Sequence, residues 1–258
     1  MDIHEPKPQF GARVFGLGVV AMALVCLAWG DLDGGQPVPA SLPGRMAIVH
    51  AVALFMLGAG GAMLWRRTVA WGAAALTAYY ILVVVVLMNG RVILAHHAEF
   101  QAYNGAAEQL AIPAAGLIAY AATARIGATR AARLTRLGQV VFGLCAVVFG
   151  VAHFVYMNLT APLVPAWLPP SQTFWGYATG LAHIAAGVAI ACRIRGRLAA
   201  ILLTAMYAGF SLLVHLPLAF AHPASHFVWA ENALNVTLIG CAWIMADSFA
   251  RPAGKAPK

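Results

Sequence analysis

The stretch TVAWGAAALTAYYILVVVVLMNG at residues 68–90 decides the fold. It contains no charged residue, and its length suits a helix that crosses a bilayer, which needs about 20 mainly apolar residues. Backbone polar groups in lipid must bond within their own structure, so a spanning segment is a helix or part of a closed barrel. A barrel strand would alternate polar and apolar residues, and this run is continuously apolar. The stretch therefore predicts a transmembrane helix.

Seven other stretches show the same pattern, and the overall composition agrees with it. The chain is 62% hydrophobic and 9% charged, whereas soluble domains are about 45–50% apolar and about 25% charged. These values exclude a soluble domain, a disordered chain, a disulfide scaffold and a coiled coil. We predict an all-α polytopic membrane protein with eight transmembrane helices, at residues 11–30, 45–65, 68–90, 107–124, 136–157, 174–192, 198–220 and 229–248.

The cations gather on one side of this arrangement. Both ends of the chain and the second, fourth and sixth connections hold 14 of the 16 Lys and Arg residues, and Arg45 and Arg91 are the exceptions. Because Lys and Arg in short loops stay on the cytoplasmic side, both termini are expected to be cytoplasmic. The first span lacks a small-residue cleavage site and is expected to be retained. The Ala- and Arg-rich composition points to a bacterial cytoplasmic (inner) membrane, with the lipid bilayer rather than nucleic acid as partner.

The two halves of the chain repeat one another. Residues 14–17 (VFGL) recur at 141–144, and residues 77–80 (TAYY) correspond to 204–207 (TAMY) at the same spacing. Further pairs at similar spacing are the proline-containing stretches 38–43 and 164–169, and Glu108 with Glu231. Collinear matches with a nearly constant offset indicate a tandem duplication of a four-helix unit. Since four spans is an even number, the two units share one orientation, as parallel repeats do.

This duplication divides the chain into four parts. Residues 1–124 are the first four-helix repeat, 125–136 a basic cytoplasmic linker, 137–250 the second repeat, and 251–258 a basic cytoplasmic tail. The linker is assigned from its arginines, because charged side chains are costly inside the hydrocarbon core. Two parallel four-helix repeats are therefore the predicted architecture.

Several motifs of the second half resemble the DoxX-like family of integral membrane proteins. The motifs are GVAHF at 150–154, VPAWLPP at 164–170, the glycine-rich stretch 175–187 and the basic turn RIRGR at 193–197. The resemblance implies four-helix membrane units. Some relatives are similar to quinone-linked oxidoreductase subunits, and others assist the maturation of redox proteins. At residue 183 the family usually has an acidic residue, whereas this chain has histidine.

Histidine and carboxylate side chains gather towards the predicted non-cytoplasmic face. Ionisable residues within the membrane usually face the interior of the bundle, and Tyr207, Ser211 and His215 repeat every four residues on one helix face. The predicted ligand-binding residues are His153, His183, His215, Glu231, Trp175, Tyr177 and Tyr207. Residues predicted to support them or to be their repeat equivalents are His50, His96 and Glu108.

Three interpretations of this polar group remain open. The first is a redox-associated subunit that binds quinone or a similar lipid-soluble ligand, with histidine as donor, glutamate as proton relay and nearby aromatic residues as flat walls. The second is a non-catalytic assembly or structural subunit of a membrane complex. The third is ligation of haem or a metal, for which His222 and His226 are candidates. A transporter is less consistent with the shallow depth of these residues. Other membrane redox subunits are the expected partners, and whether the protein is an enzyme stays open.

Overall fold

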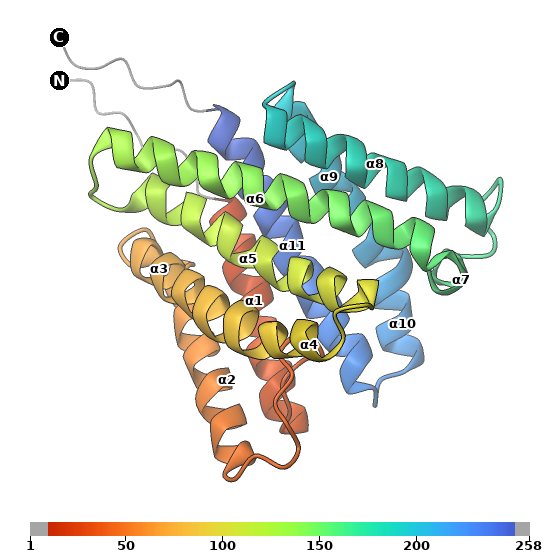
Figure 1. Ribbon diagram of the computed structural model, residues 1–258, viewed down its shortest axis with the longest axis horizontal. Helices are drawn as coiled ribbons and strands as arrows, with labels where there is room; N and C mark the ends of the chain where they lie inside the picture. Colours follow the sequence, from red (N-terminus) through yellow and green to blue (C-terminus); the bar gives the residue numbers. More distant parts are fainter. Residues whose placement is uncertain (1–9, 251–258) are drawn as a thin grey trace.

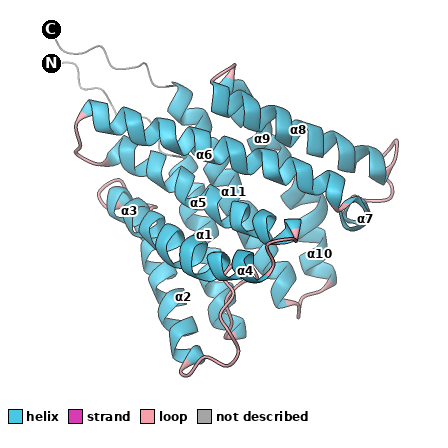
Figure 2. Cartoon of the chain, in the orientation of Figure 1, coloured by secondary structure: helices cyan, strands magenta, loops and turns pink. Residues whose placement is uncertain are grey.

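Helices and short connections make up the computed structural model, which describes residues 10–250 and has no strand in that range (Figure 2). The predicted tail at 251–258 lies outside the described residues. Within residues 10–250, seven helices are long and apolar enough to cross a membrane. The prediction of an all-α membrane protein is confirmed, and the number of eight spans stays a prediction.

The first half contains four long helical rods, of which the third changes to π-helical geometry midway. Its elements are α1 (Phe10–Trp29), α2 (Arg45–Ala62), α3 (Val69–Tyr79) continued by η1 (Tyr80–Asn89) and α4 (Gly90–Ala95), and α5 (Phe100–Thr123). The rod α5 is not among the seven apolar helices. Its amino-terminal half carries Asn104, Glu108 and Gln109, which lower its hydropathy.

The second half follows the same order of long rods. Its elements are α6 (Ala128–Val155), the short α7 (Met157–Thr160) and η2 (Ala161–Leu163), α8 (Gln172–Cys192), α9 (Gly196–Phe210) continued by η3 (Ser211–His215) and α10 (Leu216–Ala221), and α11 (His226–Ala250). The predicted linker at 125–136 is helical from Ala128 onwards. Alanine and arginine are good helix formers, so this stretch extends α6 instead of forming a loop.

The two halves pack through their first and last rods. Helix α1 lies along α11, and α5 lies along α6, so the first rod of each half contacts the last rod of the other (Figure 1). Helices α5 and α11 also contact each other in the centre of the molecule. Within each half, the first rod packs against the second, as α1 does on α2 and α6 on α8. The contact pattern of one half therefore reproduces that of the other.

Close helix approach occurs at two glycine pairs that match one another in the sequence comparison of the halves. A Cβ atom added to Gly16 would lie 2.7 Å from the carbonyl oxygen of Gly60, and one added to Gly143 would lie 2.6 Å from that of Gly187. Both distances are shorter than a real Cβ contact allows, so each pair needs glycine for the backbones to meet. This backbone contact joins α1 to α2 and α6 to α8 at equivalent positions.

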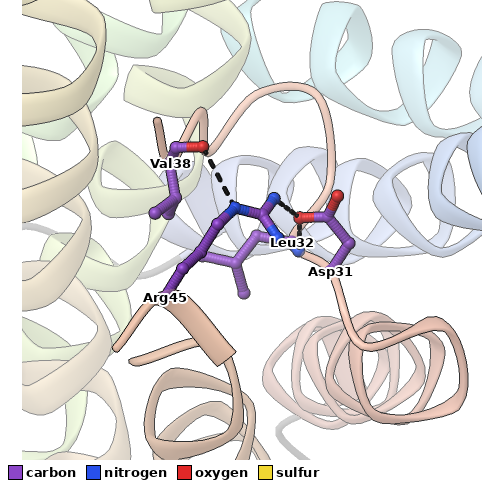
Figure 3. Close-up of polar contacts among 4 residues, drawn as sticks. All are labelled: Asp31, Leu32, Val38 and Arg45. Carbon is purple, nitrogen blue, oxygen red and sulfur yellow. Dashed lines mark hydrogen bonds and ion pairs between the residues drawn. The ribbon is translucent and has the colours of Figure 1, made fainter. Parts of the chain in front are cut away.

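The connections lie at two opposite ends of the bundle. The described chain begins and finishes at one end, here called the termini end, with the connections 63–68, 124–127 and 193–195 (Figure 1). The other end, here called the loop end, holds the connections 30–44, 96–99, 156–171 and 222–225. At the loop end, the guanidinium of Arg45 forms an ion pair with Asp31 and donates to the carbonyl oxygen of Val38 at 3.5 Å (Figure 3). These contacts fix connection 30–44 across the ends of α1 and α2.

Candidate ligand cavity

A cavity of about 230 Å³ lies between the helices of the second half and α5. Six of the predicted site residues line it: Glu108, His153, His183, Tyr207, His215 and Glu231. They come from α5, α6, α8, α9, η3 and α11. The structure therefore brings together residues that are far apart in the sequence.

The aromatic wall of the cavity differs from the predicted one. Trp175 and Tyr177 do not line it. The Trp175 indole N–H donates to the carbonyl oxygen of Pro169 at 2.9 Å, and Tyr177 is 43% exposed, with its ring against Phe154. Phe149 and Phe210 supply the wall together with Tyr207.

The other predicted histidines lie away from the cavity. His50 is exposed and its Nδ1 is 2.8 Å from the Met46 carbonyl oxygen, while His96 is exposed and lies 2.9 Å from the Glu99 carboxylate. His222 is exposed, and His226 stacks on Trp29. Within residues 10–250, no three His, Cys, Asp or Glu side chains are placed to hold a metal ion.

Gly180 on α8 and Gly150 on α6 allow the two helices to approach closely beside His153. A Cβ atom at Gly180 would lie 2.8 Å from the Cβ of His153, and a Cβ atom at Gly150 would lie 2.6 Å from the carbonyl oxygen of Gly180. The sequence pattern Gly176-x-x-x-Gly180 predicts such close approach of helices. As a result, the imidazole of His153 is held directly against the backbone of α8.

Hydrogen bonds fix the tautomers of the two central histidines. His183 Nδ1 lies 2.9 Å from the Thr179 carbonyl oxygen, and His153 Nδ1 lies 3.1 Å from that of Gly176. His153 Nδ1 is also 3.1 Å from the Thr179 hydroxyl, which itself donates to the Trp175 carbonyl oxygen at 2.7 Å. A carbonyl oxygen can only accept, so each neutral ring carries its proton on Nδ1. The Nε2 atoms of both rings make no hydrogen bond to any described residue, which leaves two acceptor lone pairs for a ligand.

Aromatic rings surround these histidines. The ring centroids of His153 and His183 are 5.1 Å apart, and those of His183 and Tyr207 are 5.5 Å apart. Phe149 meets His183 edge to face at 6.1 Å, and Phe210 stacks near His153 at 6.4 Å. His183 is only 2% exposed. The polar atoms of the site are thus enclosed by flat apolar surfaces.

The change to π-helical geometry in the α9 rod coincides with a polar contact to α11. The amide of Asn235 donates to the carbonyl oxygen of Tyr207 at 2.9 Å and to the Ser211 hydroxyl at 2.7 Å. A π-bulge frees backbone carbonyls from the regular ladder and often occurs at functional sites. Tyr207 and His215 of the predicted stripe line the cavity. Ser211 does not line it, but its hydroxyl accepts the hydrogen bond that orders Asn235.

The two glutamates bring both halves of the chain to the cavity. Glu108 accepts a hydrogen bond from the Asn104 amide at 2.9 Å, and it lies within electrostatic range of Glu231. Glu108 belongs to α5 and Glu231 to α11. The second half alone would leave the cavity without one of its two carboxylates.

A family model described as a domain of unknown function (DUF8561) matches residues 142–246. The match runs from α6 to α11, so it includes His153, His183, Tyr207, His215 and Glu231 but not Glu108. The comparison with curated proteins and the comparison with solved structures each give no significant match.

The first half fills the equivalent space with its own side chains. The spacing of the sequence matches places Cys26 and Met56 at the positions equivalent to His153 and His183, and both are buried. The amide of Gln36 contacts the Met56 sulfur at 3.8 Å, donates to Asp33 at 2.6 Å and accepts from the Tyr79 hydroxyl at 2.5 Å. Connection 30–44 therefore enters the bundle and occupies this region.

Sequence reasoning missed several residues of both regions. Phe149 lies four residues before His153, and Asn104 lies four residues before Glu108, so helical spacing places each on the face of a predicted site residue. This signal could have found them. Asp33 and Gln36 carry no such signal, because they belong to an irregular connection.

Proposed function

We propose that this protein is an integral membrane subunit associated with redox chemistry, which binds a quinone, its quinol or a similar lipid-soluble ring compound in the cavity of its second half. The observation that carries the proposal is the pair of histidines with Nδ1 bonded to backbone carbonyls and Nε2 free. Two such acceptors between aromatic walls suit a flat ligand with hydroxyl groups.

The residues of the cavity have separate roles in this proposal. The Nε2 atoms of His153 and His183 accept hydrogen bonds from ligand hydroxyl groups, so in this proposal the histidines are acceptors and not the donors that the sequence predicts. The buried Tyr207 hydroxyl has no partner among residues 10–250 and donates to a ligand carbonyl oxygen. Glu231 and Glu108 take up a proton that a histidine has accepted. The volume of about 230 Å³ lies below the usual range of about 300–1,000 Å³ for larger ligands, so the cavity holds a single ring and the tail extends outside it.

The geometry favours this ligand over a haem held by His153 and His183. Their ring centroids are 5.1 Å apart and the rings are tilted by 50°. Two axial histidines lie on opposite faces of a macrocycle, and rings in direct contact leave no space for one. A haem or metal site remains the alternative that absorption spectroscopy and metal analysis address.

We further propose eight spans in two parallel DoxX-like repeats, in a bacterial inner membrane with both termini cytoplasmic. The excess of arginine at the termini end supports this orientation. The equivalent glycine contacts and the shared contact pattern of the two halves support the duplication. On this orientation, the cavity lies nearer the non-cytoplasmic face.

Ligand binding to the purified full-length protein tests the proposal. A short-tail quinol is titrated into wild type, His183→Gln and a control, His222→Gln, which changes an exposed histidine outside the cavity. We expect His183→Gln to bind about tenfold more weakly, as the loss of one hydrogen bond implies, and His222→Gln to match wild type. The absence of quinol binding by wild type, or an equal loss in both variants, would contradict the proposal.

A non-catalytic assembly role is the second candidate. Its supporting observation is the first half, whose equivalent region is filled by the buried, hydrogen-bonded side chains of Gln36 and Asp33. A protein that binds no quinol, yet associates with other membrane redox subunits, would favour this role.

A further inference from the structure

The turn between α8 and α9 concentrates positive charge at the termini end. Arg193, Arg195 and Arg197 are all exposed. Within residues 10–250, none of the three has an ion-pair partner or a side-chain hydrogen bond. Three cations without counter-charges in so short a turn repel one another, and an anion between them would reduce that repulsion.

The backbone of this turn is held in an uncommon conformation. Arg193 and Arg195 have φ values of 61° and 49°, in the left-handed region that non-glycine residues seldom adopt. The N–H of Ile194 closes α8 by bonding to the Ala189 carbonyl oxygen at 2.9 Å. On the other side, Phe249 of α11 packs so closely under Gly196 that a Cβ atom there would lie 2.5 Å from its ring. The arginines are therefore presented by a fixed scaffold.

An apolar groove of about 350 Å³ begins at the same turn and runs between α8 and α9. Its floor is formed by the buried residues Ala186 and Leu203, and its rim includes Ala185 and Leu202. From Leu198 to Met206 the groove follows α9 for about 12 Å. One leaflet contributes about half of the roughly 30 Å of hydrocarbon in a bilayer, so the groove extends through most of one leaflet.

Arg195 belongs to both features, because it lines the apolar groove and also a hollow of about 510 Å³ beside Arg193 and Arg197. We propose that this turn and groove form a binding site for one anionic phospholipid of the leaflet at the termini end. The phosphate lies among the three arginines, and one acyl chain occupies the α8–α9 groove. Basic pockets between transmembrane helices bind anionic lipid headgroups in this way. The proposal does not depend on quinone binding.

Native mass spectrometry of the delipidated full-length protein tests the headgroup part. Phosphatidylglycerol and phosphatidylcholine with identical acyl chains are titrated into wild type and a variant with Arg193→Asn, Arg195→Asn and Arg197→Gln. Asparagine tolerates positive φ, so it preserves the turn. We expect wild type to prefer phosphatidylglycerol, and the variant to lose at least about tenfold in affinity for it.

A charge-matched control separates a defined site from diffuse attraction. The variant Arg125→Gln, Arg130→Gln and Arg133→Gln also removes three exposed arginines from the termini end. We expect it to bind phosphatidylglycerol within about twofold of wild type. An equal loss in both triple variants, or a wild type without preference for phosphatidylglycerol, would overturn the proposal.

A substitution without charge tests the acyl-chain part. Ala185→Phe fills the groove, whereas Leu181→Phe changes an exposed residue of α8 that does not line it. We expect Ala185→Phe to weaken phosphatidylglycerol binding several-fold and Leu181→Phe to leave it unchanged. An unchanged affinity in Ala185→Phe, with folding verified by circular dichroism, would show that the groove holds no chain.

Discussion

The two halves of the molecule share one helix arrangement but differ in the same region, which is an open cavity in the second half and is filled by side chains in the first. In the second half, His153 and His183 face a cavity of about 230 Å³. In the first half, Cys26 and Met56 occupy the equivalent positions, and Gln36, which is 1% exposed, contacts the Met56 sulfur and the Tyr79 hydroxyl. The helices that frame the two regions meet through equivalent glycine pairs. The difference therefore arises from the loop-end connections and a few side chains, while the framework stays the same.

This comparison shows how two halves with the same helix arrangement can differ, one with an open cavity and the other with that region filled. Connection 30–44 is irregular and enters the bundle, where its Gly35 backbone packs directly against Gln109 and accepts a hydrogen bond from Asn89 at 2.9 Å. The corresponding connection of the second half contains α7 and η2. It leaves the histidines facing an open volume. Four predictions test how far the equivalence of the halves extends.

The largest effect is expected at the glycine contacts. Gly143→Val places a side chain against the Gly187 carbonyl oxygen, and Gly16→Val does the same against Gly60. Overpacking costs about 1–3 kcal/mol, and each kcal/mol lowers Tm by about 2–4 °C in a chain of this size. Both variants should therefore melt at lower temperature by similar amounts. Gly58→Val, at an open position of α2, is the control, and unequal losses at the two sites would break the equivalence.

The next effect concerns the side chain that fills the first half. Gln36→Ala removes the hydrogen bonds to Asp33 and Tyr79 and creates a cavity beside Met56. We expect a loss of about 1–2 kcal/mol in stability, because buried polar partners are left unsatisfied. Thermal melting checks this value. Gln101→Ala, at an exposed position of α5, should leave Tm unchanged. An equal decrease of Tm in Gln101→Ala would contradict the role given to Gln36.

A smaller effect is a pH dependence that originates at Asp33. Burial raises the pKa of this carboxyl above its ordinary value, against the lowering effect of the hydrogen bonds from Gln36 and Gly35. Between the unfolded and folded pKa values, the native state holds a proton that the unfolded state has lost. Stability therefore falls as pH rises through this window and levels off above the folded pKa.

Asp33→Asn removes that proton equilibrium. We expect the plot of Tm against pH to fall less steeply from pH 4 upwards in the variant than in wild type. Since the other carboxylates are present in both proteins, the difference between the slopes reports Asp33. Parallel curves would show that Asp33 has the same pKa in the folded and unfolded states.

The smallest effect compares two tyrosines at equivalent positions of the two halves. The hydroxyl groups of Tyr80 and Tyr207 are both buried and have no partner among the described residues. Tyr80→Phe should change stability by less than about 1 kcal/mol, because it removes an unsatisfied group. Tyr207→Phe should change stability by a similarly small amount, but it should also weaken quinol or quinone binding several-fold. Equal ligand affinity in the two variants would remove Tyr207 from the site.

The long helices could be predicted from the sequence because hydropathy alone defines them. The start of α5 could not, since the residues FQAYNGA at 100–106 show no continuous apolar run. Packing against the rest of the bundle buries Ala102 and Asn104 there and keeps the segment helical. The burial of Gln36 could not be predicted either, because its partners Asp33, Met56 and Tyr79 are brought together only by the tertiary structure.

The histidine cluster could be predicted from the depth of each histidine along its transmembrane helix, whereas the aromatic residues around the cluster could not. Trp175 and Tyr177 are near His183 in sequence, but helix geometry turns each residue by about 100°. Tyr177, six residues before His183, therefore points away from the histidine face. Thr179, four residues before it, shares that face and lies 3.1 Å from His153. Helix faces were a better guide than sequence proximity.

The packing of α1 against α11 also has a consequence for biogenesis. The glycine-lined face of α1 meets its partner only after nearly all of the remaining chain has been synthesised, because Gly18 packs on Thr237 and Gly240 packs on Phe15. At about 5–20 residues per second, translation delays that contact by roughly 10–45 seconds. During this interval lipid or an insertion factor must cover the face. A ribosome that stops before α11 leaves a chain in which this face of α1 lacks its partner helix.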